Sequence, residues 1–133
     1  MGQKIHPLGF RVGVTEPWRS RWFARGNDYA SKLLIDHKVR KTIRKRFRKG
    51  VISRIDIQQR GDRMTINLWA TRKGEVIGRG YATRDALVSD LEDMSGMEVK
   101  LDIQEVGHWD LDSKTVAENL AGAIERRVSP RHQ

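Results

Sequence analysis

Hydrophobic residues recur along this chain with two spacings, and each spacing predicts a different kind of element. The first clear stripe repeats every fourth residue and predicts a helix with Asp28 as its N-cap and Gly50 as its C-terminal stop. This stripe consists of Ile35, Val39, Ile43 and Phe47. Residues 1–27 show no lasting period and contain several Gly and Pro residues, so we expect an extended or irregular lead there.

Strict alternation of apolar and polar residues follows the first helix and predicts a β-hairpin. It runs from Arg54 to Gln58 and again over residues 64–69, with Gly61-Asp62 between the two runs as a tight turn. The same alternation over residues 97–104 predicts a third strand.

Two further helices are predicted by the longer spacing. One has Thr83 as its cap and ends near Gly96, and the other begins at Asp112 or Ser113 and is stopped by Pro130. We expect their inward stripes to be formed by Leu87, Val88, Leu91 and Met94 in the first, and by Val116, Ala117, Leu120, Ile124 and Val128 in the second.

This order of elements predicts an α+β fold, with a small three-stranded sheet and helices on one sheet face. A chain of 133 residues is long enough for one such domain. We therefore expect residues 28–133 to form the domain and residues 1–27 to precede it.

Positive charge is concentrated at the N-terminal end of the chain. The first fifty residues hold 14 Lys/Arg and 3 Asp/Glu, whereas the other 83 hold 12 and 14, for a net charge of +9. A polyanion is the expected partner, and nucleic acid is the first candidate. Eight cations with no acid among them lie close together: Lys38, Arg40, Lys41, Arg44, Lys45, Arg46, Arg48 and Lys49.

A charge run is usually a solvated helix face, but repulsion between like charges four residues apart would weaken this helix. Phosphate contacts would offset that cost through counterion release. We therefore expect RNA or DNA contacts from Lys38, Lys41, Arg44, Lys45 and Arg48.

A second candidate binding element is the glycine-rich segment over residues 73–81. Gly78-Arg79-Gly80 would let backbone N–H groups approach a phosphate closely. The alternative is a tight turn that needs glycine for a positive φ, and the residues alone leave both interpretations open. A glycine loop between short helices, flanked by strands, is how a KH domain clamps single-stranded nucleic acid.

Aromatic residues and arginines are neighbours throughout the lead. Such aromatics more often pack on a domain's own core than stack on bases, so we expect packing for most of them. The adjacent arginines would be free to reach phosphates. The residues concerned are Phe10, Arg11, Trp18, Arg19, Arg21, Trp22, Phe23 and Arg25.

The sequence favours neither an enzyme nor a metal or cofactor site. Cysteine is absent, no serine stands in a nucleophile elbow, and Asp90, Glu92 and Asp93 are expected on a solvated helix face. No apolar run reaches the length that spans a bilayer, so we expect no membrane partner. The four histidines are scattered without metal-ligand spacing: His6, His37, His108 and His132.

Residues 1–13, followed by the segment from Arg19 to Ala24, resemble the opening of the bacterial-type small-subunit ribosomal protein S three family. The resemblance extends over essentially the whole chain through blocks at 52–55, 74–79, 116–119 and 125–128. It implies a type II KH domain with an N-terminal extension, located in the head of the small ribosomal subunit near the mRNA entrance. The implied partners are small-subunit rRNA, neighbouring head proteins and mRNA, with no covalent chemistry.

By position, the resemblance implies RNA-binding roles in three regions. The glycine loop contributes Gly78, Arg79 and Gly80, and the C-terminal region contributes Arg126, Arg127 and Arg131. The rRNA-docking lead contributes Lys4, Arg11, Arg19, Arg21 and Trp22. Arg25 is expected to contact RNA from its place among the aromatic residues and arginines of the lead.

The chain departs from the family pattern in three places. Tyr81 occupies the place of the loop's last glycine, so we expect weaker clamping of single strands. Arg84 stands where an apolar residue is expected. The family continues into a second α/β domain, whereas this chain ends at Gln133, so we expect that domain to be absent or supplied by a separate chain. For this reason we do not assign the family's mRNA-unwinding role.

Two other classes of function stay open at this stage. A free-standing KH-type RNA chaperone or ribosome assembly factor is the main alternative, and an RNA-processing enzyme is disfavoured by the lack of clustered acids and histidines. The expected location is a ribosome, either in a bacterial cytoplasm or in a plastid or mitochondrion that makes its own ribosomes.

Overall fold

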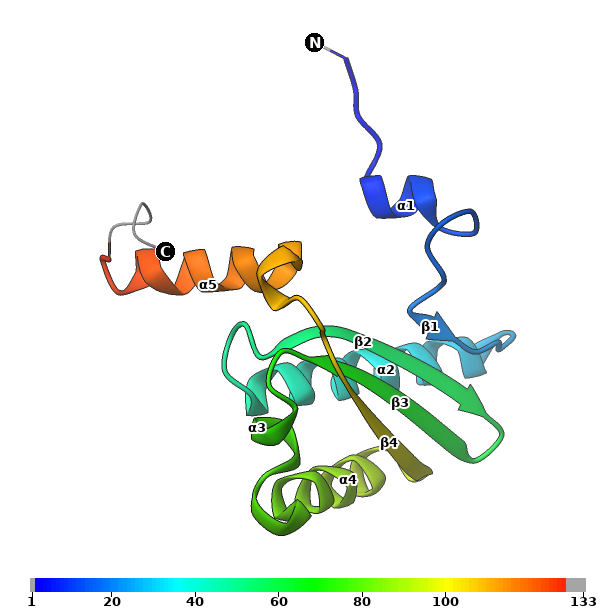
Figure 1. Ribbon diagram of the computed structural model, residues 1–133. Helices are drawn as coiled ribbons and strands as arrows, with labels where there is room; N and C mark the ends of the chain where they lie inside the picture. The colour runs from blue at the N-terminus through cyan, green and yellow to red at the C-terminus, as the bar shows by residue number, and fades with distance from the viewer. Residues whose placement is uncertain (1, 129–133) are drawn as a thin grey trace.

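The computed structural model describes residues 2–128, and Figure 1 shows how their elements are arranged. Two single 3₁₀ turns, η1 (Arg79–Tyr81) and η2 (Trp109–Leu111), precede the last two long helices. The helices and strands in chain order are α1 (Pro7–Arg11), β1 (Ser20–Arg21), α2 (Asn27–Arg46), β2 (Ile52–Arg60), β3 (Arg63–Ala70), α3 (Lys73–Ile77), α4 (Ala82–Ser95), β4 (Glu98–Glu105) and α5 (Ser113–Glu125).

The four strands form one sheet in the order β1-β2-β3-β4. β2 and β3 are the predicted antiparallel hairpin, and Gly61 in the connecting turn has a φ of 56°. β4 pairs with β3 in parallel, as the helical crossover through α3 and α4 allows. The three long strands confirm the predicted sheet, and β1 adds a short fourth strand at its edge.

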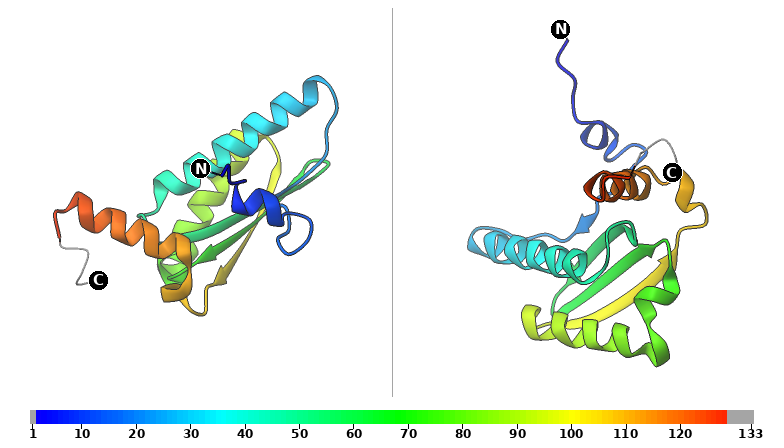
Figure 2. Two further views of the ribbon diagram at one scale, coloured as in Figure 1. Left: turned by 90° about the horizontal axis from the view of Figure 1, so that it is seen from above. Right: turned by 90° about the vertical axis from the view of Figure 1, so that its left-hand side faces the viewer.

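The hydrophobic core lies between the sheet and the pair of helices α2 and α4. Both helices cover the same face of the sheet, as the right-hand view of Figure 2 shows. Val39 and Ile43 of α2 and Leu87 and Leu91 of α4 are fully buried. Burial of each such side chain contributes about 1.5–3 kcal/mol. The predicted stripes of these two helices are thus confirmed at the positions that face the sheet.

Three predicted boundaries of α2 and α4 are wrong. α2 begins after Gly26 and ends at Arg46, so Asp28 lies in its first turn and Gly50 belongs to the loop before β2. α4 begins after Tyr81, and Thr83 lies inside its first turn rather than capping it. Gly96, with a left-handed conformation, does end α4 as predicted.

The lead is more ordered than its lack of periodicity suggested. Pro7 opens α1, a five-residue helix, because its fixed φ suits the first turn. Ser20 and Arg21 then pair in parallel with Ile57 and Gln58 of β2. The lead therefore joins the sheet instead of running past it.

α5 is placed differently from the prediction. Asp112 caps it, accepting hydrogen bonds from Thr115 N and Thr115 Oγ1 at 2.9 and 2.6 Å. The predicted inward stripe, however, faces solvent: Ile124 is 62% exposed, and only Thr115 and Ala123 of this helix are buried. The reason is that α5 lies beyond the end of the sheet (Figure 1), where, among the described elements, it contacts mainly η2 and β2. α5 ends at Glu125, with Arg126 as its C-cap and Arg127 at a positive φ, so the predicted continuation through Val128 to a stop at Pro130 is wrong; Pro130 itself lies outside the described residues.

Candidate nucleic-acid interface

The four sides of helix α2 face the core, helix α4, the lead and solvent. Val39 and Ile43 face the core. On the side toward α4, Arg46 forms an ion pair with Asp90, and Thr42 contacts the Met94 sulfur at 3.8 Å. The side toward the lead carries Asp36 and Arg40, and the remaining side faces solvent.

Seven of the eight clustered cations are exposed; five of these seven have no acidic partner in the described part of the chain, and we call these five the outer cations. Within residues 2–128, none of them lies within ion-pair distance of a carboxylate. The other three have acidic partners: Arg40 pairs with Asp36, Arg46 with Asp90 and Lys49 with Glu125. The outer cations are Lys38, Lys41, Arg44, Lys45 and Arg48. They are the same five that the sequence indicated as nucleic-acid contacts.

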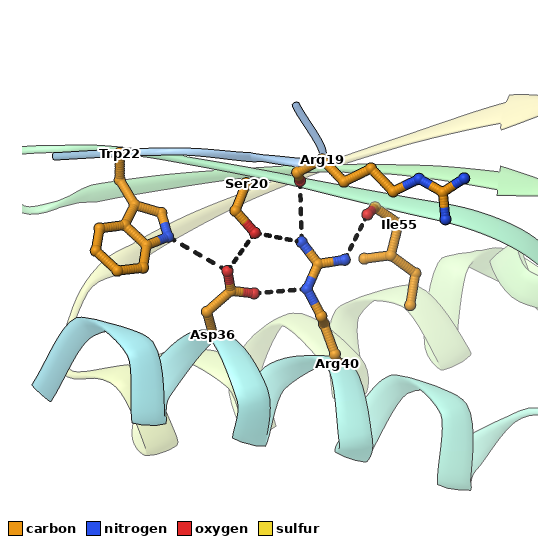
Figure 3. Close-up of polar contacts among 6 residues, drawn as sticks. All are labelled: Arg19, Ser20, Trp22, Asp36, Arg40 and Ile55. Carbon is orange, nitrogen blue, oxygen red and sulfur yellow. Dashed lines mark hydrogen bonds and ion pairs between the residues drawn. The ribbon is translucent and has the colours of Figure 1, made fainter. Parts of the chain in front are cut away.

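A network of polar contacts fastens the lead to α2 and β2 (Figure 3), and we call it the clamp. Asp36, only 4% exposed, accepts hydrogen bonds from Ser20 Oγ at 2.5 Å, Trp22 Nε1 at 3.3 Å and Arg40 Nε at 2.7 Å. Arg40 Nη1 donates to the Ile55 carbonyl at 2.6 Å. Arg40 Nη2 donates to Ser20 Oγ at 2.8 Å and to the Arg19 carbonyl at 2.9 Å.

Trp22 is part of the clamp as well as a sequence-predicted RNA contact. Its ring is half-buried and lies 5.4 Å from the ring of Tyr29, centroid to centroid. The indole thus packs against the protein's own α2, as expected for an aromatic residue of the lead.

The other aromatic residues of the lead do not pack on the core, so the packing expectation is wrong for them. Phe10, Trp18 and Phe23 are 70%, 66% and 74% exposed. They stand outside the sheet because the lead touches the domain mainly through β1 and the clamp. Each of these three rings is presented to solvent in a segment rich in arginine and is available for stacking on a base.

The lead's cations are exposed along the same segment. Arg25 lies over the Phe23 ring at 5.5 Å, and Arg21 Nε donates to the Trp18 carbonyl at 3.3 Å. Arg11 donates to the Pro7 carbonyl within α1 at 3.2 Å. Lys4 and Arg19 are exposed as well.

A lysine that the sequence did not single out adds to the positive charge near the clamp. Burial lowers the pKa of the Lys114 ammonium; Glu118 partly opposes this, and the positive charges of Arg44 and Arg19 lower that pKa further. Lys114 Nζ donates to the Ile52 carbonyl at 3.1 Å. The start of α5, α2 and the lead thus contribute cations to one region.

The cap of α5 lies next to that region. Burial tends to raise the pKa of the Asp112 carboxyl, but hydrogen bonds from Thr115 and Ser53 outweigh it, and the pKa falls below its usual value. Asp112 therefore holds its negative charge at the helix N-terminus, where the helix dipole favours it.

The glycine loop, between α3 and α4, lies apart from the lead in Figure 1 and in the right-hand view of Figure 2. Gly78 and Gly80 have positive φ values of 74° and 59°, and Tyr81 has φ 65°. A side chain at position 78 would collide with Thr83, so glycine is required there. Arg84 is half-buried, and its guanidinium lies 5.9 Å from the Tyr81 ring centroid. Arg79 is exposed and available to a phosphate.

The C-terminal candidates lie at the end of α5. Arg126 donates from Nε to the Gly122 carbonyl at 3.0 Å, and Arg127 has a φ of 58°. Both are exposed. Arg131 lies outside the described residues. The described structure therefore brings the lead, α2 and the start of α5 together, while the glycine loop and the end of α5 are separate.

Sequence reasoning missed the residues that build the clamp. Arg40 was counted with the exposed cations, and Asp36 was not considered. One signal could have found them: Asp36 and Arg40 are four residues apart and border the Val39–Ile43 stripe, so they share one side of the helix next to the core. Ser20, their partner, carries no such signal.

Neither a metal site nor a membrane span is found in the part of the chain that the structure describes. No group of three or more His, Cys, Asp or Glu side chains in residues 2–128 could hold a metal ion. No helix of that region is long and apolar enough to cross a membrane.

Comparisons with known proteins agree with the resemblance seen in the lead. The chain is 42% identical to small ribosomal subunit protein uS3 of Caldicellulosiruptor saccharolyticus, over 97% of this chain and 59% of that protein. It is 42% identical to uS3 of Desulfatibacillum aliphaticivorans over the same shares, and 40% identical to uS3 of Dehalococcoides mccartyi over 98% and 47%. The chain thus spans about half to three-fifths of the length of these relatives. The predicted resemblance is confirmed.

The family described as KH domain matches residues 34–110, more than half of the chain. That match runs from α2 through the hairpin, α3 and α4 to β4 and η2. The order helix, two strands, two helices and strand is the expected type II arrangement. The chain therefore belongs to the KH domain family.

Proposed function

We propose that this chain is a structural component of the small ribosomal subunit, located in its head near the mRNA entrance, where it binds small-subunit rRNA. The observation that carries the proposal is the set of five outer cations beside a lead that presents three exposed aromatic rings. The names of the relatives, all ribosomal, support the ribosome as the setting.

Binding would be mainly electrostatic, with a stacking contribution. Each phosphate neutralised by an outer cation releases condensed counterions, which favours association and makes it salt-dependent. Phe10, Trp18 and Phe23 add stacking on unpaired bases, worth about 1–3 kcal/mol per base. This mode needs no covalent step, so the proposed role is not enzymatic.

The proposed rRNA contacts fall into a main and a minor group. The main group contains the outer cations with Lys4, Arg11, Arg19, Arg21 and Arg25. The minor group contains Gly78, Arg79 and Gly80 of the glycine loop and Arg126 and Arg127 of α5. The loop is minor because Tyr81 stands where a glycine would allow close approach of a strand. The groove beside the loop is lined by Lys73, Ile77, Tyr81, Arg84, Leu101, Asp102 and Ile103. Arg131 belongs with the minor group, and Trp22 acts through packing.

The exposed stripe of α5 supports protein partners in addition to RNA. Val116 and Ile124 are exposed large apolar residues on this helix, and exposed Val128 follows its end; the relatives are longer than this chain. We propose that neighbouring head proteins, or a separate chain that supplies a second domain, cover this stripe. mRNA is a further RNA partner in this setting. The proposed location is the ribosome of a bacterial cytoplasm or of an organelle with its own ribosomes.

Sedimentation distinguishes this proposal from an RNA chaperone or assembly factor. Tagged protein expressed in cells should migrate with mature small subunits on sucrose gradients. It should stay with them after a wash in about 0.5 M salt, which strongly screens exposed charges. Release into the light fractions at that salt, or association with immature particles only, would identify a transient factor and refute the structural role.

A further inference from the structure

We infer that Asp36 and Arg40 are positioning residues for RNA binding: they touch no RNA, but through Ser20 they lock the lead at a fixed place beside the outer cations. This inference rests on the proposed RNA-binding function. It assigns to a carboxylate and an inward-facing arginine a role that a count of surface charges would miss.

The clamp has few unsatisfied groups. All three guanidinium nitrogens of Arg40 donate hydrogen bonds, and both oxygens of Asp36 accept them. Three of the acceptors or donors belong to the lead: the Arg19 carbonyl, Ser20 Oγ and Trp22 Nε1. Charge-assisted bonds of this kind are about twice as strong as neutral ones, and they are stronger still where water is excluded.

The other attachments of the lead are few: Lys32 Nζ of α2 donates to the Phe23 carbonyl at 3.4 Å, and the Trp22 ring packs beside Tyr29. β1 is two residues long and is joined to β2 beside the hydrogen bond from Ile57 N to the Arg19 carbonyl at 2.9 Å. Glu16 approaches Arg54 at 3.8 Å, and both side chains are partly exposed. Most of the lead's large apolar side chains face solvent, so apolar burial apart from the half-buried Trp22 adds little to its attachment. The clamp is therefore the main attachment of the lead.

A fixed lead changes how RNA is bound. Arg19 and Arg21 flank the clamped Ser20, so their backbone positions relative to α2 are set before RNA arrives. A free lead would have to be ordered at the moment of binding, and that entropy cost would weaken association. Preorganisation by the clamp thus lets the lead and α2 contact one RNA surface at the same time.

Asp36→Asn distinguishes the positioning role from a simple effect of charge, because the two predict opposite changes in RNA affinity. It removes a negative charge, so a simple charge account predicts equal or tighter RNA binding. Positioning predicts weaker binding and a salt slope lower by roughly one to two units, because Arg19 and Arg21 no longer reach their phosphates together. The matched control is Asp28→Asn, which removes an exposed acid from the same helix and should not lower the slope.

Ser20→Ala tests the same point with no change in charge. It removes the hydroxyl shared by Asp36 and Arg40 and should also weaken binding and lower the slope, by up to about tenfold in affinity if one good charge-assisted contact is lost. Ser31→Ala, on the exposed side of α2, is its control. Both clamp variants should melt as cooperative folded proteins.

Limited trypsin digestion measures how firmly the clamp holds the lead in the absence of RNA. Cleavage after Arg19 and Arg21 should be faster in both clamp variants than in the parent, whereas the two control variants should match the parent. Clamp variants that bind the rRNA fragment with the parent's affinity and slope would overturn the inference, as would unchanged cleavage. A parent protein that resists cleavage yet ignores RNA would refute the proposed function instead, leaving the clamp as a structural attachment only.

Discussion

Replacing four of the outer cations by glutamine gives the most direct measure of the interface on α2. The four are Lys41, Arg44, Lys45 and Arg48, which are exposed and have no acidic partner in the described part of the chain. Glutamine keeps a long polar side chain and good helix propensity, so the change is mainly one of charge.

The expected magnitude follows from counterion release. Each lost phosphate contact lowers the slope of log K against log salt by about 0.9 on a duplex, so four contacts lower it by roughly 3 to 4 units. Between 50 and 200 mM salt, the parent should therefore lose about 100-fold more affinity than the variant. Folding should change little. Removing like-charge neighbours stabilises the helix by about 0.2–0.5 kcal/mol per pair, while losing cations from the last turn costs about 0.3–1 kcal/mol each.

The assay is a filter-binding titration with a small-subunit rRNA helix fragment at four or more salt concentrations. The control replaces Arg60, Arg63 and Lys100, exposed cations at the hairpin end of the sheet, and should change the slope by less than about one unit. If the quadruple variant keeps the parent's slope, or if the control lowers it equally, α2 is not the phosphate-binding surface.

Three other predictions concern stability and are checked by urea unfolding. Gly50→Ala should cost about 1–2 kcal/mol because φ is 83° and the new Cβ would displace Asn119; Gly74→Ala, in open space within a helix, should cost nothing measurable. Asp112→Ala should cost about 0.5–2 kcal/mol. Because the folded pKa of Asp112 is lowered, its contribution is present above about pH 4, the unfolded value, and is lost as pH falls through the folded pKa; equal losses at pH 7 and pH 2 would contradict this. Gln59→Met should stabilise the fold by about 1 kcal/mol or more, since neither buried amide atom of Gln59 has a hydrogen-bond partner in the described chain, and a lower midpoint would show that the amide is satisfied.

Periodicity predicted those elements of the fold whose apolar residues face the sheet. The hairpin and β4 follow from alternation alone, because each strand has one face on the core. The stripe from Val39 to Phe47 is buried for the same reason. α5 has an equally clear stripe, yet Ile124 is exposed, because a pattern shows that a face is apolar but does not show what covers it.

The candidate site was predictable where it depends on charge and unpredictable where it depends on partners. The outer cations stand out in the sequence as a run without acids. Arg40 belongs to the same run, and only the fold shows that its guanidinium is used by Ser20 and by the Ile55 carbonyl. Likewise, the exposure of Trp18 and Phe23 depends on how β1 attaches to the sheet. β1 is only two residues long, so no periodic pattern in the sequence predicts it.

The attachment of the lead also constrains the order of events during synthesis. Residues 19–22 leave the translating ribosome early, but their partners include Asp36, Arg40 and Ile55, and Ser20 pairs with Ile57. The lead therefore stays unfixed until the chain has grown well past residue 57 and α2 has docked on the hairpin. A nascent chain stalled before that point exposes the lead as an unattached cationic and aromatic segment. In that state the lead can bind RNA or chaperones nonspecifically.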